Sequence, residues 1–208
     1  MPQNWGKRLD WTGLLNTIHD FLSQQLSADA GGPRPATFTG HVKIYHSAAA
    51  TFISPSDPCG VGGARREQIK ATPSWFRGPD RYDTVFVNTN DTHEDMQGME
   101  VARIVCFFSL PCTNGVSYSC TLVHWFDYVE DKPDELTVMW MVKPSFLDNN
   151  TRYLSVVHID TVVRATHLIP IFGQELVPSR VNSHNSLDIY HRFYVNHFID
   201  HHVFELVF

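Results

Sequence analysis

Two histidines near the C-terminus have the spacing of a metal site. His197 and His201 stand four residues apart inside the segment 186–201. If this segment is helical, both imidazoles lie on one helix face, as metal ligands require. The residues between them include no Glu, so the metalloprotease pattern of two His around a Glu is absent. We interpret the pair as surface histidines and expect no metal and no cofactor.

A second set of residues has the types needed for acid–base chemistry. His158 and Asp160 are two residues apart in an apolar, strand-like stretch, so both side chains point to one side of the strand. His124 lies in another such stretch. The sequence places no Ser or Cys beside them as a nucleophile. An enzyme fragment with a site at His124, His158 and Asp160 therefore remains the alternative to a noncatalytic protein.

Positive charge gathers in the segment 54–81, which is rich in Gly and Pro and contains aromatic residues. Guanidinium groups beside an aromatic ring suit phosphate groups, stacked bases or an acidic peptide. The residues that we expect to make such contacts are Arg65, Arg66, Trp75, Arg77 and Arg81.

The same segment has a structural interpretation. Trp75 and Phe76 can be buried anchors, and the arginines can pair with Glu67, Asp80 or Asp83. The residues would then stabilise the fold instead of binding a partner. The sequence leaves both interpretations open.

Composition restricts the class of partner. The chain has 22 acidic and 16 basic residues and a net charge of −6, which disfavours a nonspecific grip on nucleic acid or on an anionic membrane. A local basic patch remains compatible with DNA. The four cysteines match no metal or redox spacing, and the N-terminus has no apolar run. We expect an intracellular protein without a membrane partner.

These candidate residues need elements to position them. The apolar residues from 11 to 26 follow a helical period, and a Gly- and Pro-rich stretch follows, so residues 1–30 are predicted as an amphipathic helix with a linker. Residues 38–208 are predicted as one β-rich domain. Within this domain we expect a long basic and aromatic loop over 54–81 and a C-terminal helix over 186–201.

The centre of the β-rich domain is the segment 101–126. Two β-rich runs flank Asn114 and Gly115, which is typical of a hairpin, because Gly and Asn tolerate the positive φ angles of a tight turn. Short strand-like runs separated by polar turns continue to residue 172. The predicted fold class is mainly β with flanking helices: a small antiparallel curved sheet or barrel with a C-terminal helix.

The chain resembles a known family over residues 38–206. The segments VARIVCFFSL, TLVHWFDYVEDKPDE, VVHIDTVVRATHLIPIFG and LDIYHRFYVNHFIDHH are similar, in the same order, to the C-terminal region of fungal transposon-derived proteins of the Plavaka type. Members of that family have Gly where Val138 stands here. The strand order around LVHWF is also similar to that of bromo-adjacent homology domains, which are chromatin modules built on a curved β-barrel.

The resemblance implies a role without catalysis. In the Plavaka-type family, cutting and joining belong to a metal-binding acidic triad in an upstream domain, so no catalytic residue is carried onto this chain. We therefore expect a noncatalytic, nuclear interaction module that binds a chromatin protein, a transposase partner or DNA. The alternative is a fragment of a hydrolytic or metal-dependent enzyme with a His/Asp site.

Overall fold

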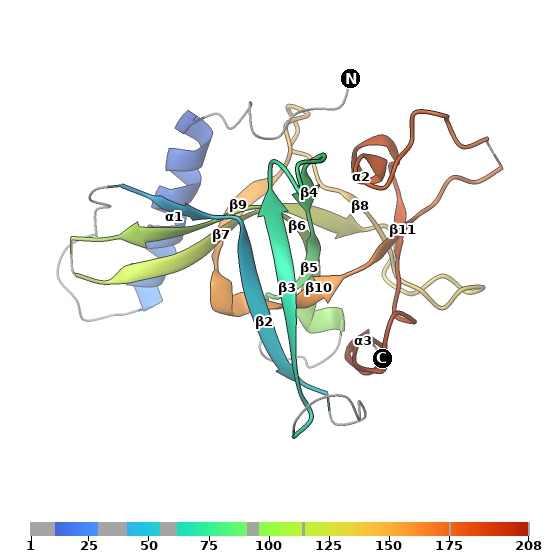
Figure 1. Cartoon of the computed structure of the whole chain (residues 1–208), viewed down its shortest axis with the longest axis horizontal. Helices are drawn as coiled ribbons and strands as arrows, with labels where there is room; N and C mark the ends of the chain where they lie inside the picture. Colours follow the sequence, from blue (N-terminus) through green and yellow to red (C-terminus); the bar gives the residue numbers. More distant parts are fainter. Residues whose placement is uncertain are drawn as a thin grey trace.

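The computed structural model describes residues 11–28, 41–54, 62–90, 96–113, 115–174 and 176–207. It confirms the expected fold class, since antiparallel strands dominate and helices lie near both ends of the chain (Figure 1). The helices are α1 (Trp11–Ala28), α2 (Ser186–Ile189) and α3 (His201–Val207), with short 3-10 turns η2 (Met96–Gly98) and η3 (Ile159–Thr161). The strands are β1 (Lys43–Tyr45), β2 (Ser47–Ile53), β3 (Ala64–Thr72), β4 (Arg81–Tyr82), β5 (Thr84–Asn88), β6 (Met99–Pro111), β7 (Ser117–Tyr128), β8 (Met141–Pro144), β9 (Leu154–His158), β10 (Val162–Thr166), β11 (Leu168–Pro170) and β12 (Phe193–Val195).

The main sheet is barrel-like and nearly closed. Its path of paired strands runs β10, β5, β6, β7, β8, β12 and β11, while β1 pairs with β6 and β9 pairs with β7. Only His167 separates the two end strands β10 and β11 in the chain, so the sheet curves back on itself. Strands β2, β3 and β4 form a second, smaller sheet.

The predicted hairpin is present as β6 and β7. Its pairing continues to Pro111 opposite Ser117, and Gly115 in the connection has φ of 80°, a conformation open to glycine and costly for most other residues. Asn114 lies outside the described residues. The register shifts between Ile104 and Cys106, so Val105 is the extra residue of a bulge, which exchanges the faces of the residues that follow.

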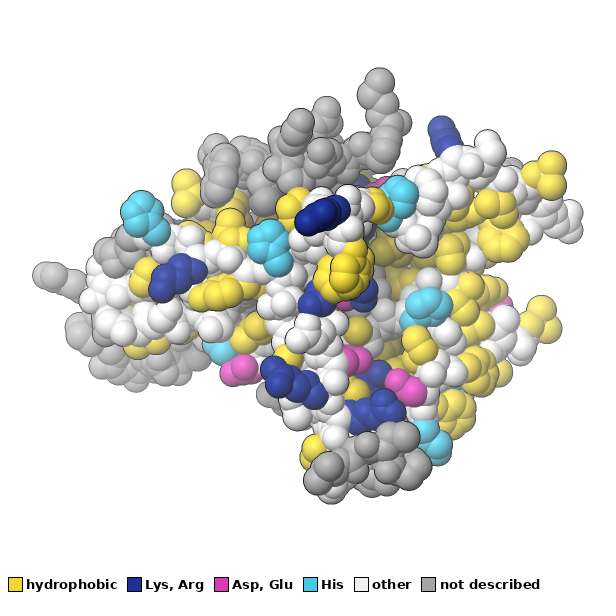
Figure 2. Space-filling view, viewed as in Figure 1, with side chains coloured by type: hydrophobic (Ala, Val, Ile, Leu, Met, Phe, Trp, Pro, Cys, Tyr) yellow, Lys and Arg dark blue, Asp and Glu magenta, His cyan; other side chains and the backbone are white. Residues whose placement is uncertain are grey.

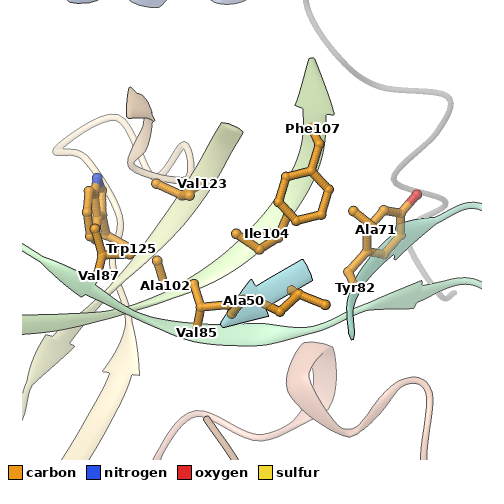
Figure 3. Close-up of a cluster of buried hydrophobic side chains, with 11 residues drawn as sticks. Ala50, Ala71, Tyr82, Val85, Val87, Ala102, Ile104, Phe107, Val123 and Trp125 are labelled. Atoms are coloured by element: carbon orange, nitrogen blue, oxygen red, sulfur yellow. The ribbon is translucent and has the colours of Figure 1, made fainter. Parts of the chain in front are cut away.

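One face of this hairpin packs against the small sheet (Figure 3). Ala102, Ile104 and Val123 on the hairpin are fully buried there, and Ile69 and Ala71 from β3 lie in the same apolar cluster. Burying a large aliphatic side chain stabilises the fold by roughly 2 kcal/mol. The small sheet is therefore held on the barrel by apolar contact.

The other face of the hairpin carries two separate apolar clusters. Helix α1 buries Ile18, Phe21 and Leu22 on one of them, as the helical period over residues 11–26 predicts. The C-terminal segment buries Phe193 and Val203 on the other. The space between the two clusters is polar.

Two sequence expectations were wrong. The segment 54–81 is not one long loop, because it contains β3 and β4; β3 pairs with β2 along its length. The charged residues of β3 hide its strand character, since the outer half of the strand is not buried. The helix over 186–201 is also wrong, because it is divided into α2, β12 and the start of α3. Strand β12 pairs with β8 and β11, which buries Phe193 and Val195 completely.

Within the described residues, no helix has the length and apolar character needed to cross a membrane.

Candidate functional site

The five predicted contact residues do not form one surface. Arg65 and Arg66 lie near the start of β3, whereas Trp75 and Arg77 follow its end and Arg81 opens β4. Strand β3 has nine residues, which at 3.3 Å per residue span about 26 Å. Figure 1 shows β3 running the whole way from the β2–β3 connection toward β4. The structure therefore brings Trp75 and Arg81 together and separates them from Arg65 and Arg66.

Trp75 is the centre of the group at the end of β3. Lys70 Nζ lies 5.0 Å and Arg81 Cζ lies 5.1 Å from the centroid of its ring. Both distances are within the range of a cation–π contact. The ring of Phe76 meets it edge to face, with centroids 4.5 Å apart. Two cations and two aromatic rings thus form one continuous contact group.

The connection from β3 to β4, residues 73–80, is called the Trp75 loop below. Its backbone is closed by hydrogen bonds: Pro79 O accepts from the Trp75 N–H at 2.9 Å, and Trp75 O accepts from the Gly78 N–H at 2.8 Å. Phe76 and Arg77 have φ of 50° and 63°. Such backbone costs of order 1–3 kcal/mol at each non-glycine residue and persists only where surrounding bonds enforce it. The loop therefore presents these two side chains in a fixed geometry.

Arg81 forms an ion pair with Asp83, as the structural interpretation of this segment predicted. Its Nε donates to Asp83 Oδ1 at 2.7 Å, and its Nη2 donates to Oδ2 at 3.2 Å. Asp83 Oδ2 also accepts from the backbone N–H of Lys70 at 2.8 Å. Arg81 therefore joins β4 to β3, and its guanidinium is only partly available to a partner.

A hollow of about 630 Å³ lies beside Trp75. Its lining is balanced in charge, since it includes three acidic and three basic residues: Glu67, Asp80, Asp83, Arg81, Arg103 and Arg164. A hollow of balanced charge does not attract an anion strongly. In Figure 2, acidic and basic side chains likewise alternate with apolar ones over the centre of this face.

His197 and His201 do not lie on one helix face, so this expectation was wrong. His197 precedes α3 and is fully buried, with its ring 3.9 Å from that of Phe198, and burial lowers its pKa. His201 lies in α3 and is exposed, with Nδ1 3.2 Å from Glu205 Oε1. Among the residues that the structure describes, no three His, Cys, Asp or Glu side chains gather as metal ligands do.

The acid–base residues are only partly brought together. His158 Nδ1 lies 3.4 Å from Asp160 Oδ2, and the Asp160 side chain is 85% exposed. His124 pairs with Leu154 in the β7–β9 register, while His158 pairs with Cys120. Four residues therefore separate the two histidines along the strands, or about 13 Å. His124 does not join the His158 and Asp160 pair in one site.

Sequence reasoning missed three charged residues that the structure brings together, of which Arg103 is buried and the other two are half-buried: Arg103, Arg152 and Asp188. Arg103 interrupts the apolar run of β6 and is 4% exposed. A charged residue within an otherwise buried strand signals a paired or functional group. The sequence contained this signal for Arg103, but its partner Asp188 lies 85 residues away.

Comparison of the chain with protein-family models, with curated proteins and with solved structures finds no match.

Proposed function

We propose that this chain is a noncatalytic interaction module of a transposon-derived protein. It binds an acidic, partly apolar segment of a chromatin protein or of a transposase partner in the nucleus. The contact surface is the tip of the Trp75 loop, with Phe76 and Arg77 at its centre.

The observation that carries the proposal is the presentation of Phe76. Its side chain is 86% exposed although it sits on a hydrogen-bonded loop with positive φ. Moving an exposed aromatic ring out of water and into contact with a partner is favourable. Aromatic and Arg side chains are also enriched among the residues that contribute most binding energy. Arg77 beside it adds a guanidinium that suits a carboxylate.

Charge favours a protein partner over duplex DNA. A DNA contact neutralises several phosphates at once. The Trp75 loop offers only Arg77, with Lys70 and Arg81 on the strands at its two ends, and Arg81 already pairs with Asp83. The net charge of −6 opposes a polyanion of high charge density. A short acidic segment needs only one or two cations and an apolar anchor.

The backbone at Val138 supports the family assignment within this proposal. Val138 has φ of 58°, a conformation that favours glycine over a β-branched residue. The Plavaka-type proteins that the chain resembles have Gly at this position. The role proposed here follows from that resemblance together with the Trp75 loop.

The test is a binding assay with a labelled peptide of alternating Glu and Phe residues and with a short DNA duplex, each at two salt concentrations. We expect the peptide to bind, and the double variant Phe76→Ala with Arg77→Ala to bind about tenfold more weakly or worse. A matched control is Leu136→Ala with Arg180→Ala, because both of these residues are exposed elsewhere on the chain.

Two outcomes would contradict the proposal. One is equal peptide affinity of the wild type and the Phe76 and Arg77 double variant, with both unfolding at the same temperature. The other is duplex binding that exceeds peptide binding and falls steeply with salt, since counterion release produces that dependence.

A further inference from the structure

A second cavity, of about 1010 Å³, lies away from the tip of the Trp75 loop. It is bounded by α1, by β6 and β7, by the turn from Pro144 to Arg152, and by α2. Its size is at the upper end of the range for small-molecule sites. It occupies the polar space between the α1 cluster and the C-terminal cluster on one face of the hairpin.

A cross-strand pair of polar residues forms the floor of this cavity. Arg103 on β6 stands directly opposite His124 on β7, and their side chains are 4% and 3% exposed. Leu122 and Phe126 flank His124 on the same face and belong to the two apolar clusters. Burying a polar pair in the middle of an apolar face costs free energy, so such a pair marks a binding-site candidate.

Four charged side chains that the structure describes set the charge of the cavity wall. Arg103 Nη1 and Arg152 Nη2 each donate to the same oxygen, Asp188 Oδ1, at 3.0 Å. Lys143 also lines the cavity. The lining that the structure describes thus includes three Arg or Lys cations and one carboxylate. The Arg103 and Arg152 side chains are only 4% and 23% exposed, so their positive charge attracts an anion more strongly than fully exposed cations would.

His124 contributes a hydrogen bond and no charge. Burial, with smaller contributions from Arg152 and Arg103, lowers its pKa to about 4, although the hydrogen bond to Ser145 opposes this shift. Its Nε2 lies 2.9 Å from the carbonyl oxygen of Ser145, which can only accept, so Nε2 carries the proton. The ring is neutral at pH 7 and leaves the two guanidinium groups as the charged centre of the floor.

The rest of the lining is mixed: Thr17, His191 and the turn residues Asn149, Asn150 and Thr151 are polar, and several other side chains are apolar. Leu14 from α1, Val105 and Leu154 from the sheet, and Leu147 from the turn line the cavity with Tyr190. A ligand that fits this cavity therefore combines one anionic group, which contacts the guanidinium groups, with an apolar body, which packs on these apolar side chains.

We propose that this cavity binds a small organic anion, a carboxylate or a phosphate attached to an aromatic or aliphatic body. The anionic group lies against Arg152 and Arg103, and the body lies among the apolar side chains. Asp188 holds the two guanidinium groups in position and competes with the ligand for their charge.

The test uses three probes with similar bodies: 3-phenylpropionate, phenyl phosphate and the neutral 3-phenylpropanol. Binding to the full chain is measured by calorimetry and by chemical-shift changes in a two-dimensional NMR spectrum. We expect an anion to bind in the range of about 1 mM or tighter and the alcohol to bind at least tenfold more weakly. The ratio of carboxylate to phosphate affinity identifies which anionic group the site prefers.

Two variants connect this affinity to the cavity. Arg152→Gln removes one cation from a partly exposed position and is expected to weaken anion binding about tenfold or more. Arg180→Gln is the control and leaves it unchanged, because the Arg180 side chain is exposed and is not among the lining residues. Asp188→Asn is expected to lower the unfolding temperature without ligand and to strengthen anion binding severalfold, because the competing carboxylate is gone. A merely structural Asp188 would give the first effect without the second.

Three results would overturn the proposal. They are no binding of either anion up to about 10 mM, equal binding of the anions and the alcohol, or unchanged anion affinity in Arg152→Gln. The Trp75 loop variants described above do not touch this lining, so failure here is distinguishable from failure of the proposed function.

Discussion

Two buried arginines on the same barrel form ion-pair clusters that differ in their balance of positive and negative charge. Arg164 on β10 and Arg103 on β6 are 4–5% exposed, and each pairs with an Asp from the C-terminal segment. Arg164 holds Asp200 with two hydrogen bonds, of 2.9 and 2.7 Å, and also lies 3.4 Å from Glu67. Arg103 instead shares a single oxygen of Asp188 with a second arginine.

The difference in charge balance separates a structural cluster from a binding cluster. Around Arg164, one guanidinium meets two carboxylates and stacks on Phe52, with 4.4 Å from Cζ to the ring centroid. Burial raises the pKa of Asp200, but the hydrogen bonds from Arg164 and from the backbone of Val203 lower it more, so it ends below its ordinary value. This cluster has more carboxylates than cations and does not favour a further anion, whereas the Arg103 cluster, among the residues that the structure describes, joins two cations to one carboxylate.

The strongest test of the comparison is Arg164→Met. This change leaves Glu67 and Asp200 without the guanidinium that joins β10 to β3 and to the start of α3. Removing one partner from a buried charge cluster costs about 3 kcal/mol or more. We expect this loss in the free energy of unfolding measured with urea, and almost none for Arg180→Met. A loss below about 1 kcal/mol would show that the cluster does not hold these elements together.

We expect His124, on the floor of the cavity, to make the free energy of unfolding of the protein depend on pH. Its folded pKa of about 4 lies below its ordinary value of 6.5. The unfolded chain therefore binds the proton more readily, so the contribution of His124 is fully present above pH 6.5 and is lost as pH falls toward 4. The expected loss between pH 7 and 4.5 is roughly 2 kcal/mol, at 1.36 kcal/mol per pKa unit.

The variant His124→Gln isolates this contribution from the other histidines. Gln can still donate to the Ser145 carbonyl but does not titrate. Urea unfolding of both proteins at several pH values should give a steeper decline for the wild type between pH 6.5 and 4.5. Parallel declines would mean that His124 has the same pKa in the folded and the unfolded protein, so that burial does not favour the neutral ring.

A smaller effect on stability is expected for Arg152→Gln in the absence of ligand. The Arg152 side chain is 23% exposed, and Asp188 keeps its hydrogen bond to Arg103. We expect a loss of about 1 kcal/mol in the free energy of unfolding, well below that of Arg164→Met. If the two losses were equal, Arg152 would be as structural as Arg164, and the distinction between the clusters would fail.

The comparison also shows which parts of the molecule the sequence could predict. Local patterns were enough for the α1 helix and for the β6–β7 hairpin with its turn at Gly115, because period and turn chemistry act over a few residues. They failed at β3, whose charged residues conceal the strand, and at β12, where pairing with β8 and β11 outweighs a helical period.

The candidate sites could be predicted only where their residues are near in sequence. Trp75 and Arg81 fall within seven positions, and they are the two predicted contact residues that the structure brings together. Arg103 and Asp188 are 85 residues apart, and Arg164 and Glu67 are 97 apart. Their pairing depends on how the sheet closes, which no local pattern contains. The expectation of one helix face for His197 and His201 was wrong because α3 begins only at His201, after strand β12 and a turn.

The smallest expected effect comes from an exposed ion pair, which sets the scale for the two buried clusters. Lys132 Nζ lies 2.7 Å from Glu135 Oε1, but the two side chains are 64% and 81% exposed. Solvent and salt screen such a pair, and holding two long side chains in one geometry costs entropy. A double-mutant cycle of Lys132→Ala and Glu135→Ala should give a coupling below about 0.5 kcal/mol, and the coupling should vanish at high salt. A coupling as large as that between Arg164 and Asp200 would mean that burial and charge balance do not decide the strength of ion pairs in this chain, and the contrast between the two arginine clusters would lose its physical basis.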